Sequence, residues 1–349
     1  MKKITTRNSN IELLRIISVI LIIGSHLIRR YEDPSTLSLA NMQWYYFLTG
    51  GLFAVNIFLL ISGYFLIDEK EFKINKIIKI ILMAFFYSNA LIIIRIVFNM
   101  NYFDLKGIIH NIFPITFNRW YFVNNYLILY ILFPFINKLI HSLKKNEFRG
   151  LIIILSVVLC IIPTLTATSY YSNNIVWFIF MYLIGAYIKL YIDPKKYKHF
   201  ILYAIGLYIL TLGVSLISSI AVDKYSLSGY WAKLPVYLLN LKKLPFLIVS
   251  ILLFIGFLNI NIKENKIINK IATASLGVYM VHRLFIDLFY KESYYSTNIF
   301  AFIGLSILFI LIVYILSVIV DLIREEIHKR LLSKHIDNLS NKIKTRISS

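Results

Sequence analysis

Long apolar runs separated by short polar and basic clusters make up most of the chain. Ten of these runs approach or exceed the roughly 20 mostly apolar residues that a helix needs to cross a bilayer. They cover residues 11–29, 44–67, 77–98, 120–140, 150–166, 174–191, 200–221, 243–260, 271–290 and 298–322. The pattern predicts an all-α integral membrane protein with about ten transmembrane helices. Pro134, inside the fourth run, predicts a kink in that helix.

The first apolar run, residues 11–28, follows basic residues and has the outline of a secretory signal peptide. It is longer than the apolar part of such a peptide, and it ends in Arg29-Arg30 without a small-residue cleavage pattern. We therefore expect a first helix that is retained.

The distribution of basic residues predicts the orientation of these helices. If the N-terminus is cytoplasmic, the inner segments carry 24 Lys and Arg residues and the outer segments carry 9. This bias predicts cytoplasmic termini at both ends and an even number of spans. We accordingly divide the chain into a transmembrane domain, residues 1–322, and a basic cytoplasmic tail, residues 323–349. The tail is helix-like and is expected to lie on anionic membrane lipid.

Composition supports a membrane protein and argues against other classes. Hydrophobic residues make up 59% of the chain and charged residues 15%, with a mean hydropathy of +0.73. A soluble domain carries about 25% charged residues, so lipid is the expected solvent. The net charge of +20 lies in clusters between the apolar runs, which indicates membrane orientation and no nucleic-acid partner. Cys160, the single cysteine, lies inside an apolar run, so we expect no disulfide framework and no metal site.

Ionisable side chains inside the predicted spans are costly and mark candidate functional sites. They are Arg15, His26, Arg95, Lys138, His282, Arg283 and Asp287. Asp287 has two interpretations: it orients a histidine, or it is solvated near its helix end. Arg95 and Lys138 lie close to helix ends and receive no role. Asp321 and Lys189 also lie near helix ends, where we expect their side chains to reach the interface.

Arg15 and His26 lie on one face of the first helix. They are eleven residues apart, which is three turns plus about 20°, and about 16 Å along the axis. A guanidinium suits a phosphate group, and an imidazole suits proton abstraction near neutral pH. The alternative interpretation is structural: Arg15 pairs with Glu12, and His26 is a packed polar group near the outer interface.

Four ordered motifs resemble the membrane-bound acyltransferase family 3. The run NIELLRIISVILIIGSH is similar to the opening helix of that family, in which a basic residue precedes a histidine; Arg15 and His26 fit this spacing. VNIFLLISGYFL resembles its second-helix motif, which is followed by a basic pair. Lys76 and Lys79 stand in this pair, where the family usually has arginines, and lysine lacks the bidentate fork of arginine.

Two later segments extend the resemblance to about residue 322. FNRWYFVNNYLILYILFPFINKLI is similar to the aromatic fourth helix of the polysaccharide O-acetyltransferase branch. ASLGVYMVHRLFI resembles the late Tyr-x-x-His helix, with Tyr279 and His282. The Ser62-Gly63 pair is expected to allow a close helix crossing, because the context of a hydrolase nucleophile is missing.

The resemblance implies a multi-pass protein of the bacterial plasma membrane that moves an acetyl group from cytoplasmic acetyl-CoA to a carbohydrate hydroxyl. The acceptor is a cell-surface polysaccharide or its lipid-linked precursor, and polysaccharide-synthesis machinery is an implied partner. Acetyl-CoA serves as acyl donor, with no metal. Under this hypothesis His26 is the general base. The other predicted site residues are Asn56 and His282 for catalysis, Arg15, Lys76 and Lys79 for the donor, and Trp120, Tyr121 and Asn124 for the substrate.

Other interpretations stay open at this point. Trp120 and Tyr121 either stack on a sugar or belong to an interfacial aromatic belt. The protein as a whole is alternatively a transporter or flippase for a lipid-linked sugar, or a non-catalytic subunit of a polysaccharide synthase. A transporter leaves the three-turn spacing between Arg15 and His26 unexplained, and no internal repeat indicates a transporter plan. The presence of a candidate base argues against a non-catalytic subunit.

Overall fold

The computed structural model describes residues 8–28, 51–98, 104–166, 174–228, 235, 237–290 and 299–348. These residues form helices and connecting segments without any strand, which confirms the predicted all-α class. The longer helices are α1 (Ser9–Ile28), α3 (Ala54–Leu66), α4 (Ile74–Val97), α6 (Tyr121–Ser142), α7 (Lys145–Ser156), α9 (Asn174–Tyr191), α10 (Phe200–Tyr225), α12 (Leu244–Asn259), α14 (Ser275–Phe289) and α15 (Ile299–Ser348). The shorter segments are α5 (Leu105–Ile112), η1 (Val157–Ile161), α8 (Ile162–Thr166), η2 (Pro194–Lys196) and α13 (Lys266–Thr273).

Seven helices in the described part of the chain are long and apolar enough to cross a membrane. An eighth span results if α13 and α14 are counted together, although a bend of 61° separates them. Two further apolar helices, α3 and α12, are shorter. The protein is therefore a multi-pass membrane protein, while the total of ten spans and the cytoplasmic termini stay predictions. Pro134 lies within a helix that continues to Ser142.

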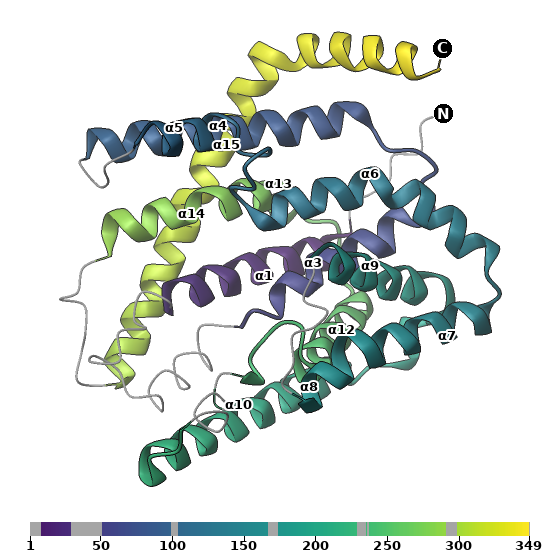
Figure 1. Cartoon of the computed structure of the whole chain (residues 1–349), viewed down its shortest axis with the longest axis vertical. Coiled ribbons are helices and arrows are strands. Elements are labelled where there is room, and N and C mark those ends of the chain that lie inside the picture. Colours follow the sequence, from purple (N-terminus) through teal and green to yellow (C-terminus); the bar gives the residue numbers. More distant parts are fainter. Residues whose placement is uncertain are drawn as a thin grey trace.

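Contacts between distant segments define the two ends of the bundle. The Ser9 hydroxyl donates to Asn269 Oδ1 at 3.0 Å, and Asn10 contacts the backbone of Ile260 and Ile262, so α12 ends beside the start of α1. We call this the Ser9 end. The opposite end, where α1 finishes and α12 begins, is the Ile28 end. In Figure 1, α1 runs from its start at the Ser9 end, in the middle of the view, to the Ile28 end at the left.

Helices α3, α9 and α12 form the most tightly packed part of the molecule, which we call the α3–α9–α12 core. A Cβ added at Gly63 would collide with the backbone carbonyl of Tyr182, and one added at Gly185 would collide with that of Leu60. The two backbones touch because neither position carries a side chain. The close crossing that Ser62-Gly63 predicted is confirmed.

A second packed region joins α1, α4, α14 and α15. Figure 1 shows α15 crossing the direction of α1, α4 and α14. Asp321 is 1% exposed, accepts a hydrogen bond from the Tyr87 hydroxyl at 2.8 Å and pairs with Arg324 at 2.7 Å. Its carboxylate also lies against Gly277. The prediction that Asp321 reaches the interface is wrong, because α15 continues far beyond it and buries it between α4 and α14.

Candidate functional site

Two histidines from opposite parts of the chain meet between α1 and α14. Nδ1 of His26 and Nε2 of His282 are 2.6 Å apart, and His282 is 1% exposed. The ring planes differ by 9° and the centroids are 4.9 Å apart. A nitrogen–nitrogen distance so much shorter than the centroid distance means that the rings meet edge to edge through a hydrogen bond.

The hydrogen bonds of this pair determine which nitrogen carries a proton when both rings are neutral. His282 Nδ1 lies 2.9 Å from the Val278 carbonyl oxygen, which only accepts, so Nδ1 is the protonated nitrogen. Nε2 of His282 then carries a lone pair and accepts from His26 Nδ1. This assignment places the lone pair of His26 on Nε2. The network therefore prepares His26 to take up a proton at that atom.

An ion pair fixes the other end of α14. Arg95 of α4 contacts Asp287 at 2.6 Å, and both side chains are largely buried. The structure thus shows a contact of Asp287 that neither of its two interpretations named: an ion pair with Arg95. The contact holds α14 against α4 one helical turn after His282.

A cationic site lies toward the Ser9 end, around the hydroxyl of Tyr126 in α6. Lys76 Nζ is 3.4 Å from this hydroxyl and 4.3 Å from the centre of the Tyr130 ring. The charge of Arg15 also acts on the Tyr126 hydroxyl. Arg15 pairs with Glu12 at 3.6 Å, as the structural alternative predicted, yet its Nε is buried without a hydrogen-bond partner among the described residues. The site therefore keeps a buried donor that a ligand can use.

Lys79 lies apart from this site. Its side chain is exposed, and its charge acts on His328 in the extension of α15. Lys76 thus contacts the Tyr126 hydroxyl and the charge of Arg15 acts on the same group, whereas the charge of Lys79 acts on a residue of the tail.

A row of aromatic rings connects the cationic site with the histidine pair. Successive centroids are 6.1 Å apart from Tyr126 to Phe122, 5.3 Å from Phe122 to Tyr279, 6.1 Å from Tyr279 to His282 and 4.9 Å from His282 to His26. The rings come from α6, α14 and α1. Besides the two histidines, the sequence suggested only Tyr279 among these rings, through the Tyr-x-x-His motif. The i, i+4 spacing of Phe122 and Tyr126 could have predicted that these two rings lie on one face of α6.

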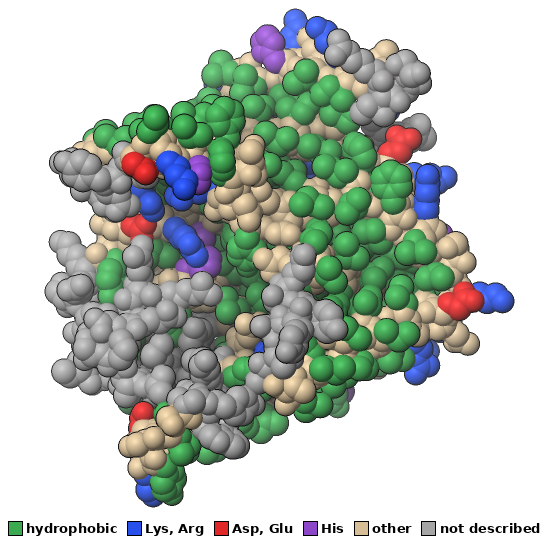
Figure 2. Space-filling model, in the orientation of Figure 1, with side chains coloured by type: hydrophobic (Ala, Val, Ile, Leu, Met, Phe, Trp, Pro, Cys, Tyr) green, Lys and Arg blue, Asp and Glu red, His purple; other side chains and the backbone are tan. Residues whose placement is uncertain are grey.

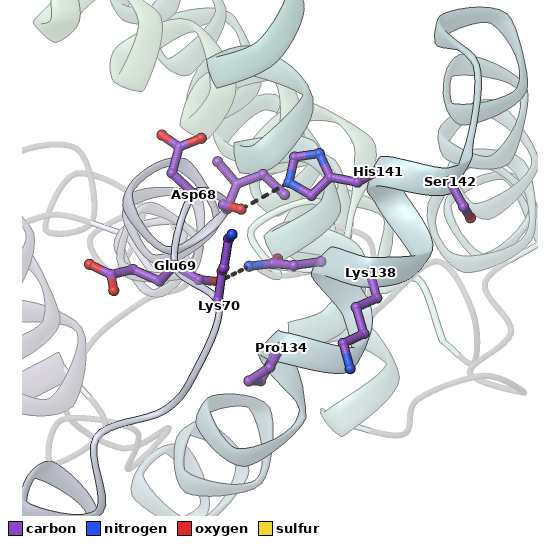
Figure 3. A pocket seen from close by; sticks show the side chains of 9 residues that line it. Asp68, Glu69, Lys70, Pro134, Lys138, His141 and Ser142 are labelled. Atoms are coloured by element: carbon purple, nitrogen blue, oxygen red, sulfur yellow. Dashed lines mark hydrogen bonds between the residues drawn. The ribbon is translucent and has the colours of Figure 1, made fainter.

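A cavity of about 470 Å³ opens at the Ser9 end, between the segment after α3 and the second half of α6. Figure 3 shows His141, Lys138 and Pro134 arriving from α6, opposite Asp68, Glu69 and Lys70. His141 contacts the Ile67 carbonyl at 3.2 Å. Two acidic and two lysine side chains line the cavity, so its charges do not select an anion and we give it no ligand.

The predicted substrate residues lie at the start of α6. Trp120 is the residue before the helix and Tyr121 is its first, exposed residue. Tyr121 acts electrostatically on Tyr279, one of the rings of the row. The Asn124 amide donates to the Ile115 carbonyl, and its Oδ1 is buried without a hydrogen-bond partner in the described part of the chain.

Asn56 lies in the α3–α9–α12 core. Its Nδ2 donates to the Leu241 carbonyl at 2.8 Å and to Ser250 Oγ at 3.3 Å, and its Oδ1 accepts from Trp177 Nε1 at 2.9 Å. Both functional groups of this amide are therefore engaged by protein atoms. The geometry gives Asn56 a packing role and offers no donor directed at the histidines.

Figure 2 shows how charge is distributed on one face of the molecule. Blue, purple and red side chains gather together at the left of this face, in the region that α5 and α14 occupy in Figure 1, and much of the central surface is apolar. Other charged side chains lie along the right rim, toward the Ser9 end. Among the described residues, no group of three or more His, Cys, Asp or Glu side chains is arranged to hold a metal ion.

A family model described as an acyltransferase domain matches residues 8–319, which is most of the chain. No curated protein and no solved structure matches the chain. The match begins one residue before α1 and extends into α15. It therefore includes both histidines and the cationic site.

Proposed function

Because the chain belongs to acyltransferase family 3 and is a multi-pass membrane protein, we propose that it is an O-acetyltransferase. It moves an acetyl group from acetyl-CoA to a hydroxyl of a cell-surface polysaccharide or its lipid-linked precursor. The observation that carries this proposal is the 2.6 Å contact between His26 and His282, with Arg15 three turns earlier on the helix that bears His26.

His26 acts as the general base in this proposal. A sugar hydroxyl is a weak nucleophile, so Nε2 of His26 takes its proton as the oxygen attacks the thioester carbonyl. The new C–O bond forms and the C–S bond breaks. The proton passes from His26 to the departing thiolate, which leaves as the CoA thiol. His282 is a positioning residue: its Nε2 accepts from His26 Nδ1 and stabilises the imidazolium that forms.

Arg15 and Lys76 bind the phosphate groups of the donor. Lys76 contacts the Tyr126 hydroxyl, the charge of Arg15 acts on the same group, and the buried Arg15 Nε has no hydrogen-bond partner among the described residues. The axial distance of about 16 Å from Arg15 to His26 suits an extended pantetheine arm, at 1.5 Å per residue of helix. The nucleotide then lies at the Ser9 end, and the thioester lies at the histidines.

The aromatic row occupies the space between these two positions. Phe122 is 7% exposed and touches Phe58, Phe178 and Tyr279 with its ring. The donor arm must therefore lie along these rings or displace them. We expect Phe122 and Tyr279 to change rotamer when acetyl-CoA binds, which spectroscopy on a labelled protein can follow.

The decisive experiment measures O-acetyl groups on surface glycan by mass spectrometry. Cells carrying His26→Ala should lose at least 99% of the modification, because removing a general base typically costs 10²–10⁴-fold in rate. His199→Ala is the matched control, since His199 is exposed just before α10. Membrane level and folding are checked for both variants. Unchanged O-acetyl content in His26→Ala would refute the proposed base, and a glycan export defect with normal acetylation would indicate a transporter.

A further inference from the structure

Helix α15 contacts both sides of the bend that separates α13 from α14. The axes of these two helices differ by 61°. Asp321 of α15 lies against Gly277, the third residue of α14, and a Cβ added at Gly277 would collide with its carboxylate. One turn later in α15, Glu325 contacts Thr273 at 3.3 Å and Lys270 at 3.6 Å, both in α13. Helix α15 therefore holds the direction in which α14 leaves the bend.

The Asp321 carboxylate joins three helices. Its Oδ1 accepts a hydrogen bond from the Tyr87 hydroxyl of α4 at 2.8 Å and from Arg324 Nε at 2.7 Å. Its Oδ2 is buried without a hydrogen-bond partner among the described residues, which is costly for a carboxylate oxygen. The first turn of a helix carries partial positive charge, so the contact with Gly277 offsets part of this cost. The carboxylate is thus bonded to α4 and α15 and packed against the start of α14.

The contact at Gly277 adjoins the hydrogen bond that orients His282. The next residue, Val278, supplies the carbonyl oxygen that lies 2.9 Å from His282 Nδ1. His282 follows Gly277 by about 7.5 Å along the helix axis, and its Nε2 is 2.6 Å from His26 Nδ1. A chain of contacts therefore runs from the Asp321 carboxylate through the first turn of α14 to the histidine pair.

Helix α4 holds α14 near both of its ends. At the end of α14, Arg95 pairs with Asp287 at 2.6 Å. Near its start, the connection runs from Tyr87 through the Asp321 carboxylate. The two residues of α4 are separated by about 12 Å along its axis, and the two contact points on α14 by about 15 Å, so the helices lie alongside each other. Without Asp321, only one of these two attachments remains.

We propose that Asp321 is a positioning residue for the histidine pair. Its carboxylate locks the start of α14 against α4 and α15 and so holds His282 at hydrogen-bond distance from His26. This inference rests on the proposed acetyltransferase function, in which His282 stabilises the imidazolium of His26. A misplacement of about 1 Å can lower a catalytic rate about 100-fold, so a small movement of α14 has a measurable effect.

The first test measures acetyl transfer by the purified full chain in phosphatidylcholine nanodiscs. The acceptor is surface glycan from the same cells, freed of O-acetyl groups by mild base. Asp321→Ala should lower kcat about tenfold or more and leave KM for acetyl-CoA unchanged, because only the geometry of the histidines changes. Asp321→Asn should keep most of the rate, since both hydrogen bonds are made to Oδ1, which asparagine retains. Gly277→Ala should resemble Asp321→Ala, because its Cβ separates α14 from the carboxylate.

Nitrogen NMR on protein with isotope-labelled histidine gives a readout that does not depend on transfer. The chain has seven histidines, so the spectrum contains few signals. A hydrogen bond between two labelled ring nitrogens produces a nitrogen–nitrogen coupling, here between His26 Nδ1 and His282 Nε2. The wild type and Asp321→Asn should show this coupling at a pH where both rings are neutral. Asp321→Ala and Gly277→Ala should lose it.

Matched variants separate positioning from a loss of stability. Tyr87→Phe and Trp177→Phe each remove one buried hydrogen bond between helices, the first to Asp321 and the second to Asn56. Tyr87→Phe should lower kcat and weaken the coupling, whereas Trp177→Phe should do neither at an equal or larger drop in the unfolding midpoint. Glu325→Gln is the control at the bend itself and should leave kcat unchanged, because its ion pair with Lys270 is exposed.

Unchanged kcat in Asp321→Ala with the coupling intact overturns the inference. So does an equal loss of kcat in Tyr87→Phe and Trp177→Phe, which would mean that Asp321 only stabilises the fold. If Asp321→Ala does not fold, Gly277→Ala and Tyr87→Phe decide by the same two readouts. A wild-type protein that transfers no acetyl group to the glycan refutes the acetyltransferase function instead, and the coupling then still reports whether Asp321 holds the two histidines together.

Discussion

Two regions of the molecule differ in whether protein atoms satisfy their buried polar groups: the α3–α9–α12 core, and the region between α1, α6 and α14. In the core, the Asn56 amide is bound by Trp177, Ser250 and the Leu241 carbonyl, and the backbones of α3 and α9 touch. In the other region, the Arg15 Nε lacks a partner among the described residues and two imidazoles pair with each other. A buried polar group that the protein does not satisfy is costly, and in our proposal the phosphate groups of the donor satisfy the Arg15 Nε. The core holds the bundle together, and the second region is where we propose that the chemistry takes place.

The largest expected effect of a single substitution on stability lies in the core. Gly185→Ala places a Cβ against the Leu60 carbonyl and should lower the free energy of unfolding by about 3 kcal/mol, as overpacking does. Gly206→Ala is the control, because nothing lies within 4 Å of a Cβ there. It should leave stability unchanged or raise it by up to about 1 kcal/mol. Thermal unfolding in detergent measures both, and equal midpoints would contradict the tight crossing.

The next largest effect is expected at the histidine pair, where a substitution should lower activity without lowering stability. His282→Phe removes the acceptor for His26 Nδ1–H and should lower kcat about 100-fold, while KM for acetyl-CoA and the unfolding midpoint change little. The measurement is steady-state transfer by the purified protein. A parallel loss of stability and activity would mean that His282 is only a packing residue. His282→Gln, which keeps an acceptor, should recover part of the rate.

A smaller loss of stability is expected from one hydrogen bond in the core. Trp177→Phe keeps most of the ring but leaves Asn56 Oδ1 without its donor, which should cost about 1.5 kcal/mol of unfolding free energy. Chemical denaturation in detergent measures the change. Trp177→Phe in an Asn56→Leu background should cost less, because the acceptor is already gone. Equal costs in the two backgrounds would exclude the hydrogen bond as the cause.

Removing one charge from the cationic site should affect donor binding alone. Lys76→Ala should raise KM for acetyl-CoA about tenfold without changing kcat, because the lost contact is made to the bound nucleotide throughout the reaction. Lys76→Arg should retain low KM. An unchanged KM in Lys76→Ala would remove this site from donor binding. A lower kcat at constant KM would assign Lys76 to the chemical step.

The smallest effect is expected at the surface of the α15 extension. Arg330 contacts Glu326 at 2.7 Å, and both side chains are mostly exposed. Arg330→Ala should change stability by less than about 0.5 kcal/mol and leave transfer unaffected. A marked loss of activity in this variant would show that the tail takes part in donor binding.

The sequence by itself determined the class and the limits of several helices. The run predicted for 174–191 coincides with α9, and those at 243–260 and 120–140 agree with α12 and α6 to within two residues. Apolar length and helical period are local properties, so they can be read from neighbouring residues. The same period predicted that Arg15 and His26 share one side of α1. In the structure His26 contacts His282 at one end of the aromatic row, and the charge of Arg15 acts on Tyr126 at the other end.

Only the tertiary structure decided which faces meet. His26 and His282 are 256 residues apart in sequence, and their contact depends on how α14 packs against α1 after the 61° bend that a continuous apolar run concealed. Asp321 is buried because of how α15 packs, and Asn56 accepts a hydrogen bond from Trp177 because of how α9 packs. No local pattern specifies the positions of these two helices. Helical period identifies a face, but the partner of that face is chosen by close packing between distant segments.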